Sequence, residues 1–120
     1  MYIDSHCHLN FPELASQLPE ILSAMQAAHV HQAVVICTTM EEFGAVRGLA
    51  SQYPHLWATV GVHPDNEGVT EPSLDTLLEL GRLPRVLGIG ETGLDCFPEE
   101  CPWAIADEVL AQSWLPAASR

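Results

Sequence analysis

The stretch Trp-Ala-Thr-Val-Gly-Val at residues 57–62 predicts a buried β-strand, and a histidine and a proline follow it directly. Three other short apolar or β-branched runs, at residues 2–4, 33–37 and 86–89, are flanked by polar, glycine or proline residues, as strands are. The centres of the four runs lie about 24 to 32 residues apart, close to the roughly 30 residues of a strand–helix–strand unit. This spacing makes a repeated β-α arrangement the first prediction.

The segments between these runs have the apolar spacing of amphipathic helices. Their apolar residues recur every three or four positions in three groups: Leu18, Ile21, Leu22, Met25 and Ala28; Phe43, Val46, Leu49 and Ala50; and Leu74, Leu77 and Leu78. Pro72 and Ser73 are typical of a helix start, and Gly81 of a helix end. Strands that alternate with helices predict an α/β fold with a parallel sheet and outer helices. Right-handed crossovers place the carboxyl ends of all four strands at one edge.

The charge balance excludes some functions. Sixteen acidic residues stand against four arginines and no lysine, which gives a formal net charge of −12 and argues against a broad basic surface for nucleic acid. At 48% hydrophobic residues the chain can form a core, yet no apolar run approaches the roughly 18 residues of a membrane span. We therefore expect a cytoplasmic protein of one domain or part of one, without a membrane partner.

The four cysteines are scattered along the chain, at Cys7, Cys37, Cys96 and Cys101. They form no Cys-x-x-Cys pair, which disfavours a structural zinc finger, and nothing in the sequence indicates a secreted disulfide framework. Free thiols are the expected state.

Metal-capable side chains follow three of the four predicted strands. His6 and His8 are two positions apart, so in an extended segment both imidazoles project to one side while Cys7 points to the other. His63 follows the third strand and Glu91 the fourth, among glycines that permit close approach. Ligands bind at this edge in parallel α/β proteins, so the four side chains are the candidate site.

Simpler interpretations of each residue stay open. His6 and His8 could be solvent-facing loop histidines, His63 a structural histidine held by backbone groups, and Glu91 a solvated turn acid. Imidazole and carboxylate together suit zinc, manganese, iron or a mixed pair of divalent ions. Such ions lower the pKa of bound water, which predicts a metal-activated hydrolase.

Three blocks of the sequence together resemble a known family. Tyr-Ile-Asp-Ser-His-Cys-His-Leu at 2–9, Val-Gly-Val-His-Pro at 60–64 and Gly-Glu-Thr-Gly-Leu-Asp at 90–95 are similar to the signature blocks of the TatD metal-dependent deoxyribonucleases. The resemblance covers residues 1 to about 97. It implies an amidohydrolase-type TIM barrel, two divalent ions (magnesium, manganese or zinc), and 3′-to-5′ hydrolysis of DNA, or of RNA in some members.

The resemblance also implies roles for individual residues. His6 and His8 would be ligands of the first metal, and Glu91 would be a metal ligand that bridges both ions and takes part in catalysis. His63 would be a catalytic residue beside the metals that contacts the substrate phosphate. Asp4 would be a partner that orients one of the metal-binding histidines without contacting the metal, as metal-bound imidazoles commonly require.

The length departs from the family. A TIM barrel takes roughly 250 residues, so these 120 predict a partial (β/α) barrel of about four units. We expect residues 1–97 to be the amino-terminal half of a TatD-like barrel and residues 98–120 to be a divergent tail, helical or disordered. A frameshift, a splice form or a truncated gene model would explain the change of sequence near residue 96.

A partial barrel has consequences for function. We expect weak or no nuclease activity from this chain alone, and self-association through its open sheet edges. Two alternatives remain: an amidohydrolase-type esterase or amidase, which the acidic balance favours, and a non-catalytic fragment that pairs with an intact relative through an exposed strand edge.

Overall fold

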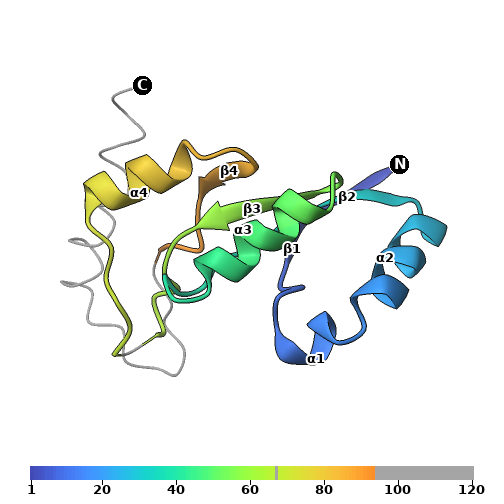
Figure 1. Cartoon of the computed structure of the whole chain (residues 1–120), viewed down its shortest axis with the longest axis horizontal. Helices are drawn as coiled ribbons and strands as arrows, with labels where there is room; N and C mark the ends of the chain where they lie inside the picture. The colour runs from blue at the N-terminus through green and yellow to red at the C-terminus, as the bar shows by residue number, and fades with distance from the viewer. Residues whose placement is uncertain (67, 94–120) are drawn as a thin grey trace.

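The computed structural model describes residues 1–66 and 68–93, which form a four-stranded parallel sheet with helices (Figure 1). In chain order the elements are β1 (Tyr2–Cys7), α1 (Pro12–Ala15), α2 (Leu18–Ala27), β2 (Val30–Val35), α3 (Phe43–Gln52), β3 (Leu56–Val60), α4 (Leu74–Gly81) and β4 (Val86–Ile89). The strands are ordered β1-β2-β3-β4, and every neighbouring pair is parallel. The predicted α/β class with a parallel sheet is confirmed.

The helix boundaries follow from local chemistry. Pro19 lies in the first turn of α2, where its missing N–H costs no hydrogen bond. Ser73 caps α4, because its hydroxyl accepts a hydrogen bond from the backbone N–H of Thr76 at 3.1 Å. The last helical residue of α4 is Gly81, as the sequence predicted. The four-residue α1 was not predicted.

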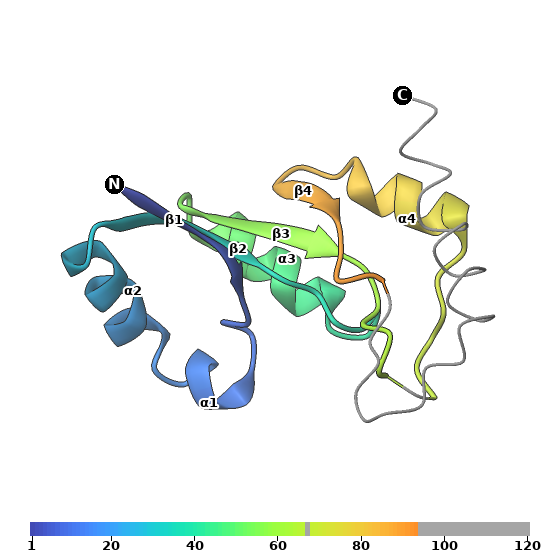
Figure 2. The ribbon, with the colours of Figure 1, turned by 180° about the vertical axis from the view of Figure 1, so that it is seen from behind.

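The core lies between the sheet and its helices. Alternate residues of β2 and β3 are fully buried, at Ala33, Val35, Leu56, Ala58 and Val60. They pack in one cluster with the apolar face of α3, which contributes Val46 and Ala50, and with Leu18 of α2. Figures 1 and 2 show α3 against one face of the strands. Burial of these side chains fixes the register of the sheet and therefore the positions of the strand ends.

Arg85, which precedes β4, ties the end of α3 to the start of β3. Its backbone is in the left-handed region at φ 73°, and its guanidinium lies 3.9 Å from the centre of the Trp57 ring. The guanidinium also donates hydrogen bonds to four main-chain oxygens around the end of α3 and the start of β3: those of Ala50, Tyr53, Pro54 and Leu56. One side chain thus links the end of α3, the start of β3 and the segment before β4.

Several strand boundaries differ from the sequence prediction, including those of β3, which is Leu56–Val60 where residues 57–62 were predicted. Strand β1 runs on to Cys7, so His6 lies within the strand and only His8 follows it. Pairing causes this extension, because the Cys7 carbonyl accepts a hydrogen bond from the N–H of Ile36 at 2.8 Å. Strand β2 begins at Val30, three residues earlier than predicted, and ends at Val35, two residues earlier than predicted. The predicted tail at 98–120 lies outside the described residues. No helix in the described part of the chain is long and apolar enough to cross a membrane.

Candidate metal centre

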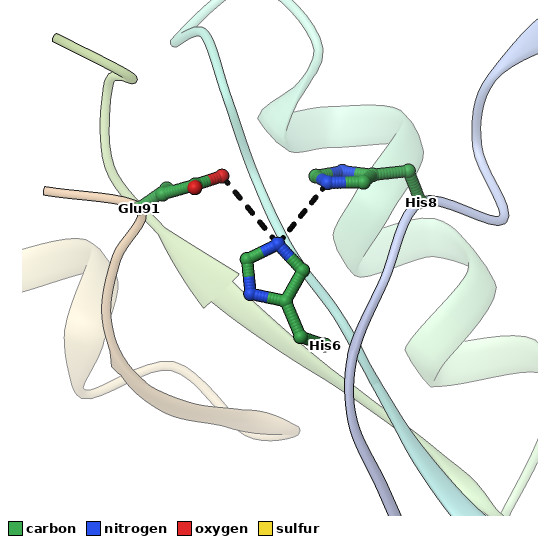
Figure 3. A group of neighbouring side chains, drawn as sticks. All are labelled: His6, His8 and Glu91. Atoms are coloured by element: carbon green, nitrogen blue, oxygen red, sulfur yellow. Dashed lines mark hydrogen bonds and ion pairs between the residues drawn. The ribbon is translucent and has the colours of Figure 1, made fainter. Parts of the chain in front are cut away.

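Two imidazoles meet at the carboxyl end of β1. The Nε2 atoms of His6 and His8 are 3.2 Å apart (Figure 3). The His8 ring stacks on Phe11, with ring centres 4.7 Å apart and planes inclined by 16°. The Asp4 carboxylate accepts a hydrogen bond from the backbone N–H of His6 at 3.0 Å. Asp4 therefore contacts His6 through the main chain, and the role in orienting a histidine that the family resemblance implies stays a prediction.

Cys7 lies between these histidines and points away from them, as predicted. Its thiol donates to the carbonyl of Val34 at 3.3 Å. Burial, with a smaller contribution from the charge of Asp4, raises the pKa of the Cys7 thiol to about 11. The thiol is therefore protonated at neutral pH and is separate from the two imidazoles.

Glu91 reaches the same point from the end of β4. Its Oε2 is 3.7 Å from His6 Nε2, and Figure 3 shows the carboxylate and the His8 ring approaching this same nitrogen from different directions. Its backbone N–H donates to the carbonyl of Cys37 at 3.0 Å, which ties Glu91 to the segment after β2. One potential ligand atom from each of His6, His8 and Glu91 lies within 4.8 Å of the others. The predicted convergence is confirmed.

Glycine permits this approach. A Cβ atom on Gly61 would lie 2.6 Å from the carbonyl carbon of Gly90 and 3.0 Å from the Glu91 nitrogen. These are backbone atoms, so a side chain at position 61 could be accommodated only if the segment that carries Glu91 moved. Gly61 therefore sets how closely Glu91 approaches β3.

His63 lies beside the cluster on the side of Glu91. Its Nε2 is 3.5 Å from Glu91 Oε1, so the two oxygens of the carboxylate face different histidines. Its Nδ1 accepts a hydrogen bond from the N–H of Asp65 at 3.1 Å, which leaves Nε2 as the nitrogen that faces the site. The four predicted site residues are thus neighbours, and their roles stay predictions.

The donor set fits a divalent cation. Two facing imidazole nitrogens hold at most one proton between them, so at least one of them presents a lone pair. Two nitrogens that share one ion at about 2.1 Å each are about 2.9–3.4 Å apart, and the observed 3.2 Å falls in that range. With the carboxylate of Glu91 they form an imidazole and oxygen set that suits zinc, manganese or iron.

Sequence reasoning missed three polar residues next to the cluster: Asn10, Thr38 and Glu42. The Glu42 carboxylate accepts hydrogen bonds from both of the others. The sequence did hold one signal, because Thr39-x-x-Glu42 resembles a helix-capping pattern, and Thr39 Oγ1 accepts the N–H of Glu42 at 3.3 Å. That pattern indicates a helix start and gives no hint of a link to a functional site.

A parallel α/β sheet with a cluster of potential metal ligands at its carboxyl edge is typical of barrel-type α/β enzymes, in which this edge carries the active site. Comparison with known proteins identifies the family: the model of TatD related DNase matches residues 3–119. The chain belongs to the TatD family.

Individual relatives agree with this assignment. Over 95% of its length, the chain is 36% identical to the uncharacterized metal-dependent hydrolase YjjV of Escherichia coli. It is also 32% identical, over 77% of its length, to the 3′-5′ ssDNA/RNA exonuclease TatD of Escherichia fergusonii. The crystal structure of the E. coli TatD homologue YjjV matches 95% of the chain with a TM-score of 0.71 and 31% identity.

The chain spans less than half the length of these relatives, 43% of YjjV and 36% of the exonuclease. It covers the same 43% of the YjjV crystal structure. The described residues therefore form a partial TatD-type barrel, which confirms the predicted fold class.

Proposed function

We propose that this chain carries the first metal site of a 3′-5′ exodeoxyribonuclease that cleaves phosphodiester bonds. The observation that supports this most is the convergence of His6, His8 and Glu91 within 4.8 Å at the carboxyl edge of the sheet. Membership of the TatD family supplies the reaction class. The name of the Escherichia fergusonii relative supplies the substrate, single-stranded DNA or RNA.

The residues would act in distinct ways. His6, His8 and Glu91 would hold a divalent ion (magnesium, manganese or zinc), which when bound supplies Lewis-acid activation of water and charge neutralisation at phosphorus. Phe11 keeps the His8 ring in its orientation by stacking. His63, with Nε2 toward the site, would donate a hydrogen bond to a phosphate oxygen of the substrate.

We further propose that the chain by itself hydrolyses DNA weakly. The described residues supply three ligands, enough for one ion with an open position. The second ion that the family resemblance implies would need ligands beyond these. With one ion, only part of the charge that develops on phosphorus would be neutralised.

The test is digestion of 5′-labelled single-stranded DNA with added manganese, together with calorimetric titration of Mn²⁺ and Zn²⁺. We expect binding of one ion per chain and slow shortening from the 3′ end, and both should disappear in His6→Ala. His31→Ala is the matched control, because His31 is an exposed histidine within β2. Digestion that survives in His6→Ala, or metal binding that His31→Ala removes equally, would overturn the proposal.

The sheet edges support a second proposal, self-association. Within the described residues, β1 and β4 each pair with one neighbour only, and both carry exposed apolar side chains: Tyr2, Ile3, Leu87 and Ile89. Unpaired strand edges readily join another chain. Sedimentation velocity should detect a dimer or larger species, and Leu87→Lys should shift it toward monomer. A wild-type chain that sediments as a monomer throughout would contradict this proposal.

A further inference from the structure

We propose that Glu42 is a positioning residue. It sets the distance between His8, which follows β1, and the pair His63 and Glu91, which follow β3 and β4. Glu42 lies at the N-cap of α3, and no role in the chemistry is assigned to it above. The inference deepens the proposed metal site and rests on it for one of its two tests.

The carboxylate of Glu42 joins the segments that follow β1 and β2. Its Oε2 accepts a hydrogen bond from Asn10 Nδ2 at 2.7 Å. Its Oε1 accepts both the backbone N–H of Thr38, at 3.2 Å, and the Thr38 hydroxyl. The residue is partly buried, and these three donors are neutral. A carboxylate that accepts on both oxygens holds its donors in fixed directions, because ionised carboxylates make short, strong hydrogen bonds.

On the β1 side the link leads to His8. Asn10 lies between His8 and Phe11, which stack on one another, and the Phe11 N–H donates to the His8 carbonyl at 3.0 Å. The Oδ1 atom of Asn10 is buried and has no hydrogen-bond partner within the described part of the chain. The Asn10 side chain is thus oriented by its contact with Glu42, which fixes the turn that carries His8.

On the other side the link leads to His63 and Glu91. The Thr38 carbonyl accepts two hydrogen bonds at 2.8 Å, from the His63 N–H and from Asn66 Nδ2. The preceding carbonyl, of Cys37, accepts the Glu91 N–H. Two adjacent peptide groups after β2 therefore hold the backbones of two site residues. Glu42 accepts the Thr38 N–H, which belongs to the same peptide group as the Cys37 carbonyl, and through the Thr38 hydroxyl it also holds the residue whose carbonyl binds His63.

The decisive experiment exchanges the hydrogen-bond donor and acceptor of the Asn10–Glu42 contact. Asn10→Asp places two carboxylates against each other and breaks the contact by repulsion. The double variant Asn10→Asp/Glu42→Gln restores a hydrogen bond in the reverse direction, from Gln to Asp, and leaves the other amide atom as acceptor for Thr38. Glu20→Gln is the matched control, because Glu20 is an exposed carboxylate in the first turn of α2.

The first measurement is amide hydrogen exchange in the metal-free protein with a chelator present. We expect Asn10→Asp to speed exchange of the His63 N–H about tenfold and the double variant to restore it. The N–H of Leu77, which bonds to Ser73 in α4, should not change and reports on global unfolding. Thr38→Val removes only the hydroxyl contact, so it decides the matter if Asn10→Asp fails to fold: we expect a smaller acceleration at His63, and no change there would overturn the proposal.

The second measurement is the Kd for Mn²⁺. Loss of a group that orients metal ligands typically weakens binding ten- to a hundredfold, and we expect a loss in this range for Asn10→Asp, with recovery in the double variant. If the wild type binds no ion but the exchange pattern appears, the proposed metal function fails and the role of Glu42 stands. If the wild type binds Mn²⁺ and Asn10→Asp leaves both readouts unchanged, or the double variant restores neither, the role of Glu42 is wrong.

Discussion

At each end of the sheet a charged side chain links neighbouring segments of the chain, and the two charges have opposite sign. At the amino end the guanidinium of Arg85 donates to four main-chain oxygens and lies over Trp57. At the carboxyl end the carboxylate of Glu42 accepts from Asn10 and Thr38. The cation satisfies carbonyl groups near the end of a helix, where positive charge is favourable. The anion leaves two carbonyls after β2 free to hold the residues of the site.

This difference separates stability from function. The contacts of Arg85 join α3, β3 and β4, so they belong to the framework of the fold. The contacts at the carboxyl end position side chains that are partly exposed, with 52% of His6 and 27% of Glu91 accessible. Changes at the amino end should therefore alter the free energy of unfolding, and changes at the carboxyl end should alter metal binding.

The largest effect on stability is expected from Arg85→Met. Loss of hydrogen bonds to several partly buried carbonyls should lower the free energy of unfolding by about 3 kcal/mol. Urea denaturation with a chelator measures this, and Mn²⁺ titration of the folded variant should give an unchanged Kd. Arg85→Gly is the companion variant, because glycine relieves the left-handed backbone at this position and should recover about 1 kcal/mol relative to Met. If Arg85→Met bound Mn²⁺ more weakly, the amino end of the sheet would also affect metal binding, which would contradict the division between the two ends.

Gly61→Ala should affect both properties. The added Cβ would meet the Gly90–Glu91 backbone, so the chain must shift. We expect a loss of about 2 kcal/mol in stability and about tenfold weaker Mn²⁺ binding, measured by denaturation and calorimetry. Gly48→Ala is the control, because a Cβ at this exposed helical position would meet no atom within 4 Å beyond the neighbouring backbone of its own helix. It should bind Mn²⁺ normally and be slightly more stable. Normal binding in Gly61→Ala would show that Glu91 is not positioned by this contact.

Ser73→Ala should have a smaller effect, limited to stability. It removes the hydroxyl that caps α4, which typically costs about 1 kcal/mol. Thermal unfolding should show the loss, and Ser73→Asp should recover it because an aspartate also caps a helix. Since the cap belongs to α4 and contacts none of the four site residues in the described structure, the Kd for Mn²⁺ should not change.

The smallest effect concerns Cys37, whose thiol is buried at the carboxyl end of the sheet. Burial raises the pKa of this thiol, so between its ordinary pKa and the raised value the folded protein holds a proton that the unfolded chain releases. The contribution of the Cys37 thiol to the free energy of unfolding should be constant below pH 9.0 and should decrease as the pH rises above it, in the same direction as the contribution of Cys7. Iodoacetamide at pH 8 should label Cys37 only after denaturation, as peptide mass spectrometry would show. Rapid labelling in the folded state would mean that the core near β2 opens.

The sequence predicted what depends on periodicity and on strand ends. Alternating and helical apolar spacing reveal β3 and α3 because burial of one face imposes those periods. His6 and Glu91 could be placed together because parallel strands end at a common edge. Glu42 and Arg85 could not be predicted. The partners of Glu42 lie 4 and 32 residues away, and those of Arg85 lie about 30 residues away, so only the folded chain shows them.

None of the four predicted site residues lies on β2, yet the segment that follows this strand positions two of them. The backbone N–H groups of His63 and Glu91 donate hydrogen bonds to consecutive carbonyls, those of Thr38 and Cys37. The relative position of these two amides therefore depends on the backbone of the segment that follows β2. Redesign of the site for an ion of larger radius would therefore have to change the backbone after Val35 as well as the ligand side chains.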